Sequence, residues 1–161
     1  MERQMISDDL MKETLQTSKI IAMVGASVPK ENEAVAKMRL KPSIIVMKYL
    51  LEFGYKVIPV NPFSVGKKVN GEIIVEKLED ISSQIDIVNV FRPSKETPDI
   101  AKKAIKVGAK TLWLQFGIQN NEADEISKSA GLTCIMNKCI KQEYQRLFLK
   151  MKPVFPVLLN D

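Results

Sequence analysis

Short apolar runs alternate along the chain with longer segments in which apolar and polar residues recur at helical spacing. The apolar runs predict strands over residues 19–24, 56–60, 72–75, 86–90, 110–115 and 132–137. The intervening segments predict helices over residues 43–53, 97–107, 121–130 and 140–150, and a further helix is expected over 7–17. Strands that are apolar throughout and separated by helices are typical of a parallel sheet covered on both faces. The pattern therefore predicts an α/β fold with a doubly wound parallel sheet in three layers, α/β/α.

Proline, glycine and small polar residues mark the ends of two of these helices. Pro42 and Gly54 flank the helix over 43–53, and we expect Ser43 to be its N-cap. Thr97 has the residue type of an N-cap, and Pro98 that of a first helical position. The sequence is therefore predicted to consist of a peripheral helix within residues 1–18, a single domain over 19–150 and a tail over 151–161.

Length and composition exclude several classes of protein. A chain of 161 residues is typical of one domain, and its 45% hydrophobic and 27% charged residues are those of an ordinary globular protein. The net charge of +5 suits an anionic small molecule. The chain has no histidine and only two cysteines, so catalytic systems that use histidine and a structural zinc site are not expected. The polar N-terminus predicts no membrane anchor and a cytoplasmic location.

Residues that leave the predicted strands are the candidates for a binding site, because ligands of such sheets bind beyond the carboxyl ends of the strands. These residues are Gly25-Ala26-Ser27, Asn61-Pro62, Phe91-Arg92, Gln115-Phe116-Gly117 and Lys138-Cys139. The loop after the first strand lacks the G-x-G-x-x-G pattern of dinucleotide sites, and no acidic residue ends the second strand. These two features disfavour a nicotinamide cofactor.

Several of these residues also have a purely structural interpretation. Gly25 could form only a tight turn, Asn61 could only shape the turn between its two prolines, and Arg92 could form a surface salt bridge. A helix N-terminus and nearby lysines could activate Cys139, or the thiol could be buried and inert. Elsewhere, Trp113 is expected in the core, and the pair Glu143–Arg146 is expected to interact along a helix.

Six short motifs follow one another along the chain. They are G-A-S at 25–27, K-P-S at 41–43, G-Y-x-V-x-P-V-N-P at 54–62, V-F-R at 90–92, W-L-Q-x-G at 113–117 and N-K-C-I-x-x-E at 137–143. Together and in this order, they resemble the small stand-alone coenzyme A-binding proteins. These proteins are relatives of the CoA-binding domain in the alpha subunit of succinyl-CoA synthetase and in ADP-forming acyl-CoA synthetases. The resemblance covers about residues 19–147. Tyr144 stands where many members have a histidine.

The resemblance implies a Rossmann-like domain that binds coenzyme A or an acyl-CoA across the strand ends. The phosphates would lie near Gly25 to Ser27 and near the start of the helix at Ser43, where Lys41 adds a positive charge. The adenosine end would lie near Asn61-Pro62 and Phe91-Arg92. Ala26 and Gln115 complete the predicted site. No catalytic residue and no metal ligand is identified.

The resemblance also bears on catalysis and partners. In the related synthetases catalysis runs through a phosphorylated histidine, which this chain lacks, so a binding protein is favoured over an enzyme. Two alternatives remain open, namely an accessory or detached CoA-binding part of an acyl-CoA synthetase and an NAD(P)- or nucleotide-sensing module. No nucleic acid or membrane is expected as a partner, and a homodimer or a protein partner stays open. Residues 28–40 are expected either to form a mobile flap over CoA or to pack as a rigid loop.

Overall fold

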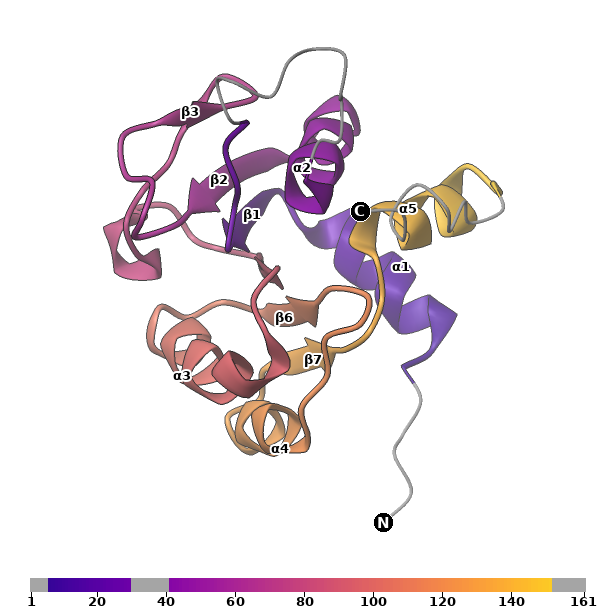
Figure 1. Ribbon diagram of the computed structural model, residues 1–161. Helices are drawn as coiled ribbons and strands as arrows, with labels where there is room; N and C mark the ends of the chain where they lie inside the picture. The colour runs from indigo at the N-terminus through magenta and orange to yellow at the C-terminus, as the bar shows by residue number, and fades with distance from the viewer. Residues whose placement is uncertain (1–5, 30–40, 152–161) are drawn as a thin grey trace.

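A five-stranded parallel sheet forms the centre of the protein. In the computed structural model, which describes residues 6–29 and 41–151, this sheet is seen between two layers of helices (Figure 1). Its strands are β1 (Ile20–Val24), β2 (Lys56–Val60), β5 (Ile87–Val90), β6 (Thr111–Leu114) and β7 (Thr133–Ile135). The α/β fold predicted from the apolar runs is confirmed.

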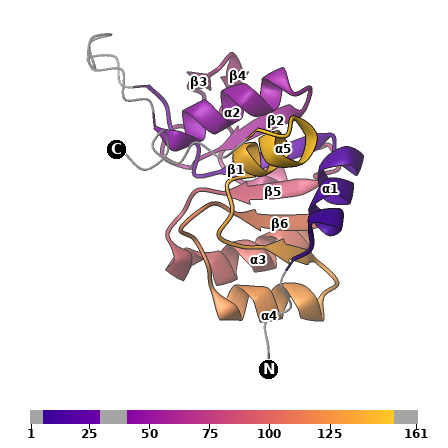
Figure 2. The ribbon, with the colours of Figure 1, turned by 90° about the vertical axis from the view of Figure 1, so that its right-hand side faces the viewer.

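In the described part of the chain, five α-helices cover the two faces of the sheet. They are α1 (Asp8–Thr17), α2 (Pro42–Glu52), α3 (Thr97–Lys106), α4 (Asn121–Ser129) and α5 (Ile140–Phe148). Figure 2 shows α2 and α5 over one face and α3 and α4 over the other. Helix α1 belongs to the first layer, since it packs against α5.

The order of the strands places the functional edge of the sheet. The order is β2-β1-β5-β6-β7, so the chain moves outward from β1 to β2 and then returns to the other side of β1 to form β5. The strand order thus reverses between β1 and β5. In open parallel sheets, this switch point leaves a crevice at the carboxyl ends of the two strands. The residues after β1 and β5 therefore flank the expected binding crevice.

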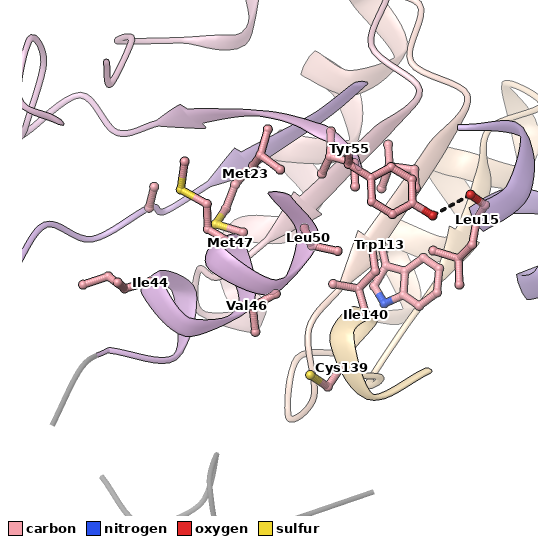
Figure 3. Packing of buried hydrophobic residues seen from close by; sticks show 14 of the residues in the cluster. Leu15, Met23, Ile44, Val46, Met47, Leu50, Tyr55, Trp113, Cys139 and Ile140 are labelled. Atoms are coloured by element: carbon pink, nitrogen blue, oxygen red, sulfur yellow. Dashed lines mark hydrogen bonds between the residues drawn. The ribbon is translucent and has the colours of Figure 1, made fainter. Parts of the chain in front are cut away.

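Side chains alternate between two hydrophobic clusters, one on each face of the sheet. Met23, Ile87 and Trp113 contribute to the cluster under α1, α2 and α5, where Trp113 is fully buried as predicted (Figure 3). Val88 and Leu112 contribute to the cluster under α3 and α4. Because both faces are covered by helices, most positions of the strands carry apolar residues, which explains the continuous apolar runs.

The carboxylate of Asp86 binds the start of β1 at the amino-terminal edge of the sheet. Its Oδ2 accepts hydrogen bonds from the backbone N–H groups of Lys19 (2.8 Å) and Ile20 (3.0 Å), and Lys110 Nζ lies 3.5 Å from Oδ1. Burial opposes ionisation of Asp86, but these N–H groups and the Lys110 charge together hold its pKa below the ordinary value. Asp86 therefore fastens the start of β1 to the start of β5.

An ion network connects the first and last helices of the described chain. Arg146 donates to both carboxylate oxygens of Asp8 (2.8 and 3.0 Å) and to Glu143 (2.7 Å), so the predicted pair Glu143–Arg146 is confirmed. In addition, the Tyr55 hydroxyl donates to the backbone carbonyl of Leu15, which fixes α1 against the chain that enters β2 (Figure 3). The helix predicted over 7–17 is thus fixed to the domain at both of its ends.

The prediction that residues 72–75 form a strand of the main sheet is wrong. Residues Glu72–Ile73 form β4, which pairs antiparallel with β3 (Lys68–Val69) in a separate hairpin. Asn70 and Gly71 between them both have positive φ, the geometry of a tight hairpin turn. Val75 then forms a parallel bridge with Val60 and so covers the free edge of β2.

The predictions that Ser43 and Thr97 are helix N-caps are also wrong. The cap of α2 is Lys41, whose side chain makes no capping bond, and Ser43 lies within the first turn of the helix. Thr97 is the first residue of α3 and follows a short 3-10 helix, η3 (Ser94–Glu96). Its hydroxyl donates to the carbonyl of Ser94 rather than accepting from the helix (2.7 Å).

Two of the predicted segments fall largely outside the described residues. Only residues 28 and 29 of the flap expected over 28–40 are described, and only Met151 of the tail over 151–161. Within the described ranges, every helix is too short or too polar to cross a bilayer.

Candidate functional site

Gly25 turns the chain sharply at the end of β1 and touches the end of β5. Its φ is +86°, and a Cβ atom built on it would lie 2.7 Å from the carbonyl oxygen of Phe91 and 2.8 Å from Arg92 Cδ. Only glycine fits so close to backbone. Its N–H donates to the carbonyl of Val60 (3.0 Å). Gly25 therefore forms the tight turn that its structural interpretation predicted. This turn lies at the switch point of the sheet.

The start of α2 is tied to the loop that follows β1. The backbone N–H of Ser27 donates to Ser43 Oγ (3.1 Å), and Ser43 is buried. Lys41 precedes the helix and is exposed. The loop at Ser27, the positive end of the α2 dipole and the Lys41 ammonium thus lie together, an arrangement that favours an anion.

Asn61 holds the turn after β2 in shape. Its Nδ2 donates to the carbonyl of the buried Ala26 (2.8 Å), while its Oδ1 accepts from the backbone N–H of Phe63 (2.8 Å). Both polar atoms of the side chain are engaged in the protein, which agrees with the structural interpretation of this residue. Pro62 and Phe63 follow at the surface, and the Phe63 side chain is 86% exposed.

Arg92 forms an ion pair with Glu96 at the surface. Its Nε and Nη2 donate to the two carboxylate oxygens (2.9 and 3.2 Å), and both side chains are about 40% exposed. The salt-bridge interpretation of Arg92 is therefore confirmed for the free protein. The guanidinium nevertheless stays at the carboxyl end of β5, where an anionic ligand could compete with Glu96 for it.

Gln115 is buried at the end of β6, beside Cys139 at the start of α5. The Gln115 side chain is 5% exposed and its Oε1 has no hydrogen-bond partner within the described part of the chain. Burial raises the pKa of the Cys139 thiol, although the Gln142 and Lys141 N–H groups and the Gln115 amide favour the thiolate. The interpretation of Cys139 as a buried, inert thiol is thus favoured.

Two cavities open at this edge of the sheet and share Gly25, Asn61 and Arg92. The α2-side cavity, of about 570 Å³, lies on the face of the sheet covered by α2 and α5. The α3-side cavity, of about 440 Å³, lies toward α3. Most of the predicted site residues line the α2-side cavity, namely Gly25, Ser27, Lys41, Ser43, Asn61, Phe91, Arg92 and Gln115.

The remaining predicted residues lie close by, and the α3-side cavity adds others that the sequence did not indicate. Pro62 lines the α3-side cavity, whereas Ala26 is fully buried behind the loop. Charged side chains of both signs also line the α3-side cavity, namely Glu76, Lys77, Glu96, Asp99 and Lys103. Asp99 and Lys103 are four apart on α3, so one face of that helix is the signal that would have found them.

Comparison with known proteins identifies the family of this chain. Residues 19–145 match the family model of the CoA binding domain. The chain is 39% identical over 131 residues to the uncharacterised protein YneT of Bacillus subtilis (strain 168), which covers 81% of this chain and 89% of YneT. The solved structure of a hypothetical protein from Pyrococcus horikoshii OT3 is also similar to this chain, with a TM-score of 0.78 and 37% sequence identity. The match covers 91% of this chain and 98% of that protein's chain.

A larger enzyme shares the fold. The dinucleotide-forming acetyl-coenzyme A synthetase 1 of Ca. Korarchaeum cryptofilum matches with a TM-score of 0.57 at 22% identity, over 80% of this chain and 27% of the enzyme. The family predicted from the motifs is thus confirmed by the match of residues 19–145 and by the similarity to YneT. This protein belongs to the CoA-binding domain family.

Proposed function

We propose that the protein binds coenzyme A or an acyl-CoA across the carboxyl ends of β1 and β5, in the α2-side and α3-side cavities. The family match of residues 19–145 carries this proposal, together with the position of both cavities at the switch point of the sheet. Coenzyme A is long and anionic at one end. Two adjoining cavities with the cationic Arg92 at their shared border suit such a molecule.

The phosphates are proposed to lie where the two cavities meet. Lys41, Arg92 and the positive end of the α2 dipole all border the α2-side cavity. Arg92 would leave Glu96 to contact a phosphate, because a guanidinium binds phosphate in the same bidentate manner as a carboxylate. The ligand thereby replaces one ion pair by another at the same place.

A nicotinamide cofactor and a synthetase reaction have less support. Strand β2 ends at Val60 and is followed by Asn61 and Pro62, so the acidic residue that ends this strand in nicotinamide sites is not found at this position. The chain contains no histidine and hence none that could be phosphorylated. The residues present therefore favour a protein whose role is to bind CoA.

A thermal-shift comparison tests the ligand. Coenzyme A is expected to raise the Tm of the protein far more than NAD or ATP at equal concentration, since a ligand of the folded state stabilises it by mass action. At a concentration 100 times Kd, the expected stabilisation is about 2.7 kcal/mol. Native mass spectrometry would weigh any CoA that remains bound. A larger shift with NAD would overturn the CoA assignment.

Substitutions of the Arg92–Glu96 pair should change CoA affinity in opposite directions. Arg92→Ala, like Lys41→Ala, is expected to weaken binding by about 1–3 kcal/mol, because each removes a charge-assisted contact. Glu96→Gln should strengthen binding, because it frees Arg92 and removes a negative charge near the phosphates. Calorimetric titration measures all three variants. Weaker binding by Glu96→Gln would place the phosphates away from Arg92.

A further inference from the structure

Two buried acceptors without partners lie on one face of the sheet near its functional edge. Within residues 6–29 and 41–151, the side-chain atoms in this state are Asn89 Oδ1 in β5 and Gln115 Oε1 just after β6. Asn89 lies opposite Trp113 in the ladder, and Gln115 is two residues beyond Trp113, so both side chains belong to the face under α2 and α5. A buried acceptor left without a donor destabilises the folded protein.

Of these two residues, Gln115 borders the α2-side cavity and Asn89 does not. Gln115 forms part of the wall of the α2-side cavity, next to Phe91, Phe116 and Ile118. Asn89 is fully buried in the core and donates through Nδ2 to the carbonyl of Trp113 (3.3 Å). A ligand group can therefore approach Gln115, whereas Asn89 is enclosed by protein.

The unpartnered atom indicates what kind of ligand group belongs beside it. An amide oxygen needs a hydrogen-bond donor, and ionised phosphate oxygens have none to offer. Phe91, Phe116 and Ile118 give this part of the cavity apolar walls. A neutral group with an N–H or O–H on a largely aliphatic chain meets both requirements. Within coenzyme A, the pantetheine arm has this character, with two amides and a hydroxyl on an alkyl chain.

We propose that Gln115 is a specificity-determining residue that accepts a hydrogen bond from an amide N–H or the hydroxyl of the pantetheine arm. This inference rests on the proposed function. The outermost torsion of a glutamine side chain is soft, so rotation about it can present Oε1 to the cavity. The Gln115 side chain also hydrogen-bonds with Cys139, which helps to orient the amide. The protein would thereby distinguish CoA from nucleotides that lack the arm.

The test replaces the amide by an apolar side chain of similar shape. Gln115→Met is expected to weaken CoA binding roughly tenfold, the effect of one hydrogen bond. Binding of adenosine 3′,5′-bisphosphate, which is the nucleotide end of CoA without the arm, should stay within twofold of the wild type. The Tm of the free variant should equal or exceed that of the wild type, because an unpartnered buried acceptor has been removed.

Asn89→Leu provides the matched control. It removes the other unpartnered acceptor at a position that does not border the cavity, so its CoA affinity should stay within twofold of the wild type. Wild-type affinity for CoA in Gln115→Met would overturn the inference. An equal loss for CoA and adenosine 3′,5′-bisphosphate would also overturn it, and both results leave the proposed function intact. Absence of CoA binding by the wild-type protein would overturn both.

Discussion

Replacing Gly25 by alanine should destabilise the protein by roughly 2–5 kcal/mol. A left-handed backbone conformation costs an alanine about 1–2 kcal/mol, and the added Cβ would lie 2.7 Å from the Phe91 carbonyl oxygen. Overpacking of this kind adds about 1–3 kcal/mol. The neighbour is backbone at the end of β5, which cannot move without opening the junction with β1. Chemical denaturation measures the loss, and CoA affinity should fall with it.

Gly66→Ala separates the clash from the backbone strain. Gly66 has nearly the same φ, +85°, but nothing lies within 4 Å of its added Cβ. This variant should therefore lose only the strain energy of about 1–2 kcal/mol and should keep wild-type affinity for CoA. Equal destabilisation by the two variants would contradict the close approach of Gly25 to Phe91.

Asp86→Ala should cost about 3 kcal/mol of unfolding free energy. The substitution leaves the backbone N–H groups of Lys19 and Ile20 without their shared acceptor, and hydrogen bonds to a charged group are worth about 1.5–3 kcal/mol each. For a domain of this size, the Tm should fall by roughly 6–12 °C. Asp86 lies at the edge of the sheet opposite the cavities, so CoA affinity is expected to be unchanged. A Tm within 2 °C of the wild type would contradict this role.

The pH dependence isolates the charge of Asp86. The folded protein holds the pKa of Asp86 below its ordinary value, so the ionised carboxylate stabilises the fold at and above the unfolded-state pKa of about 3.9. This stabilisation is lost as the pH falls through the folded-state pKa. The unfolding free energies of the wild type and Asp86→Asn should therefore differ at pH 7 and converge in acid. A difference that does not change with pH would show that the charge has no role.

Features set by a continuous pattern of residues could be predicted from the sequence. The strand over 56–60 was predicted at its observed bounds, and the burial of Trp113 followed from its place between apolar neighbours. The ion pair of Glu143 and Arg146 followed from helical spacing. Each of these depends on a local repeat, which the sequence carries directly.

Features that depend on distant contacts or on very short elements were missed. The β3–β4 hairpin has strands too short for a periodic signal, although the dipeptide Asn70-Gly71 is the usual mark of such a turn. Ser43 has a residue type suited to capping, but its hydroxyl accepts from the backbone N–H of Ser27, which lies 16 positions earlier in the sequence. A surface salt bridge of Arg92 was foreseen, but its partner Glu96 was not, because the short 3-10 helix that brings the two together gives no periodic signal.

The link between α1 and α5 extends the part of the chain that unfolds as one cooperative unit. The family match begins at residue 19 and ends at 145, yet Met11 and Leu15 lie in the same buried cluster as Ile140, and Arg146 bridges both helices. A fragment trimmed to the matched region would expose this apolar surface and lose the bridge. Helices α1 and α5 should therefore open together in hydrogen exchange, as one unit rather than independently of each other.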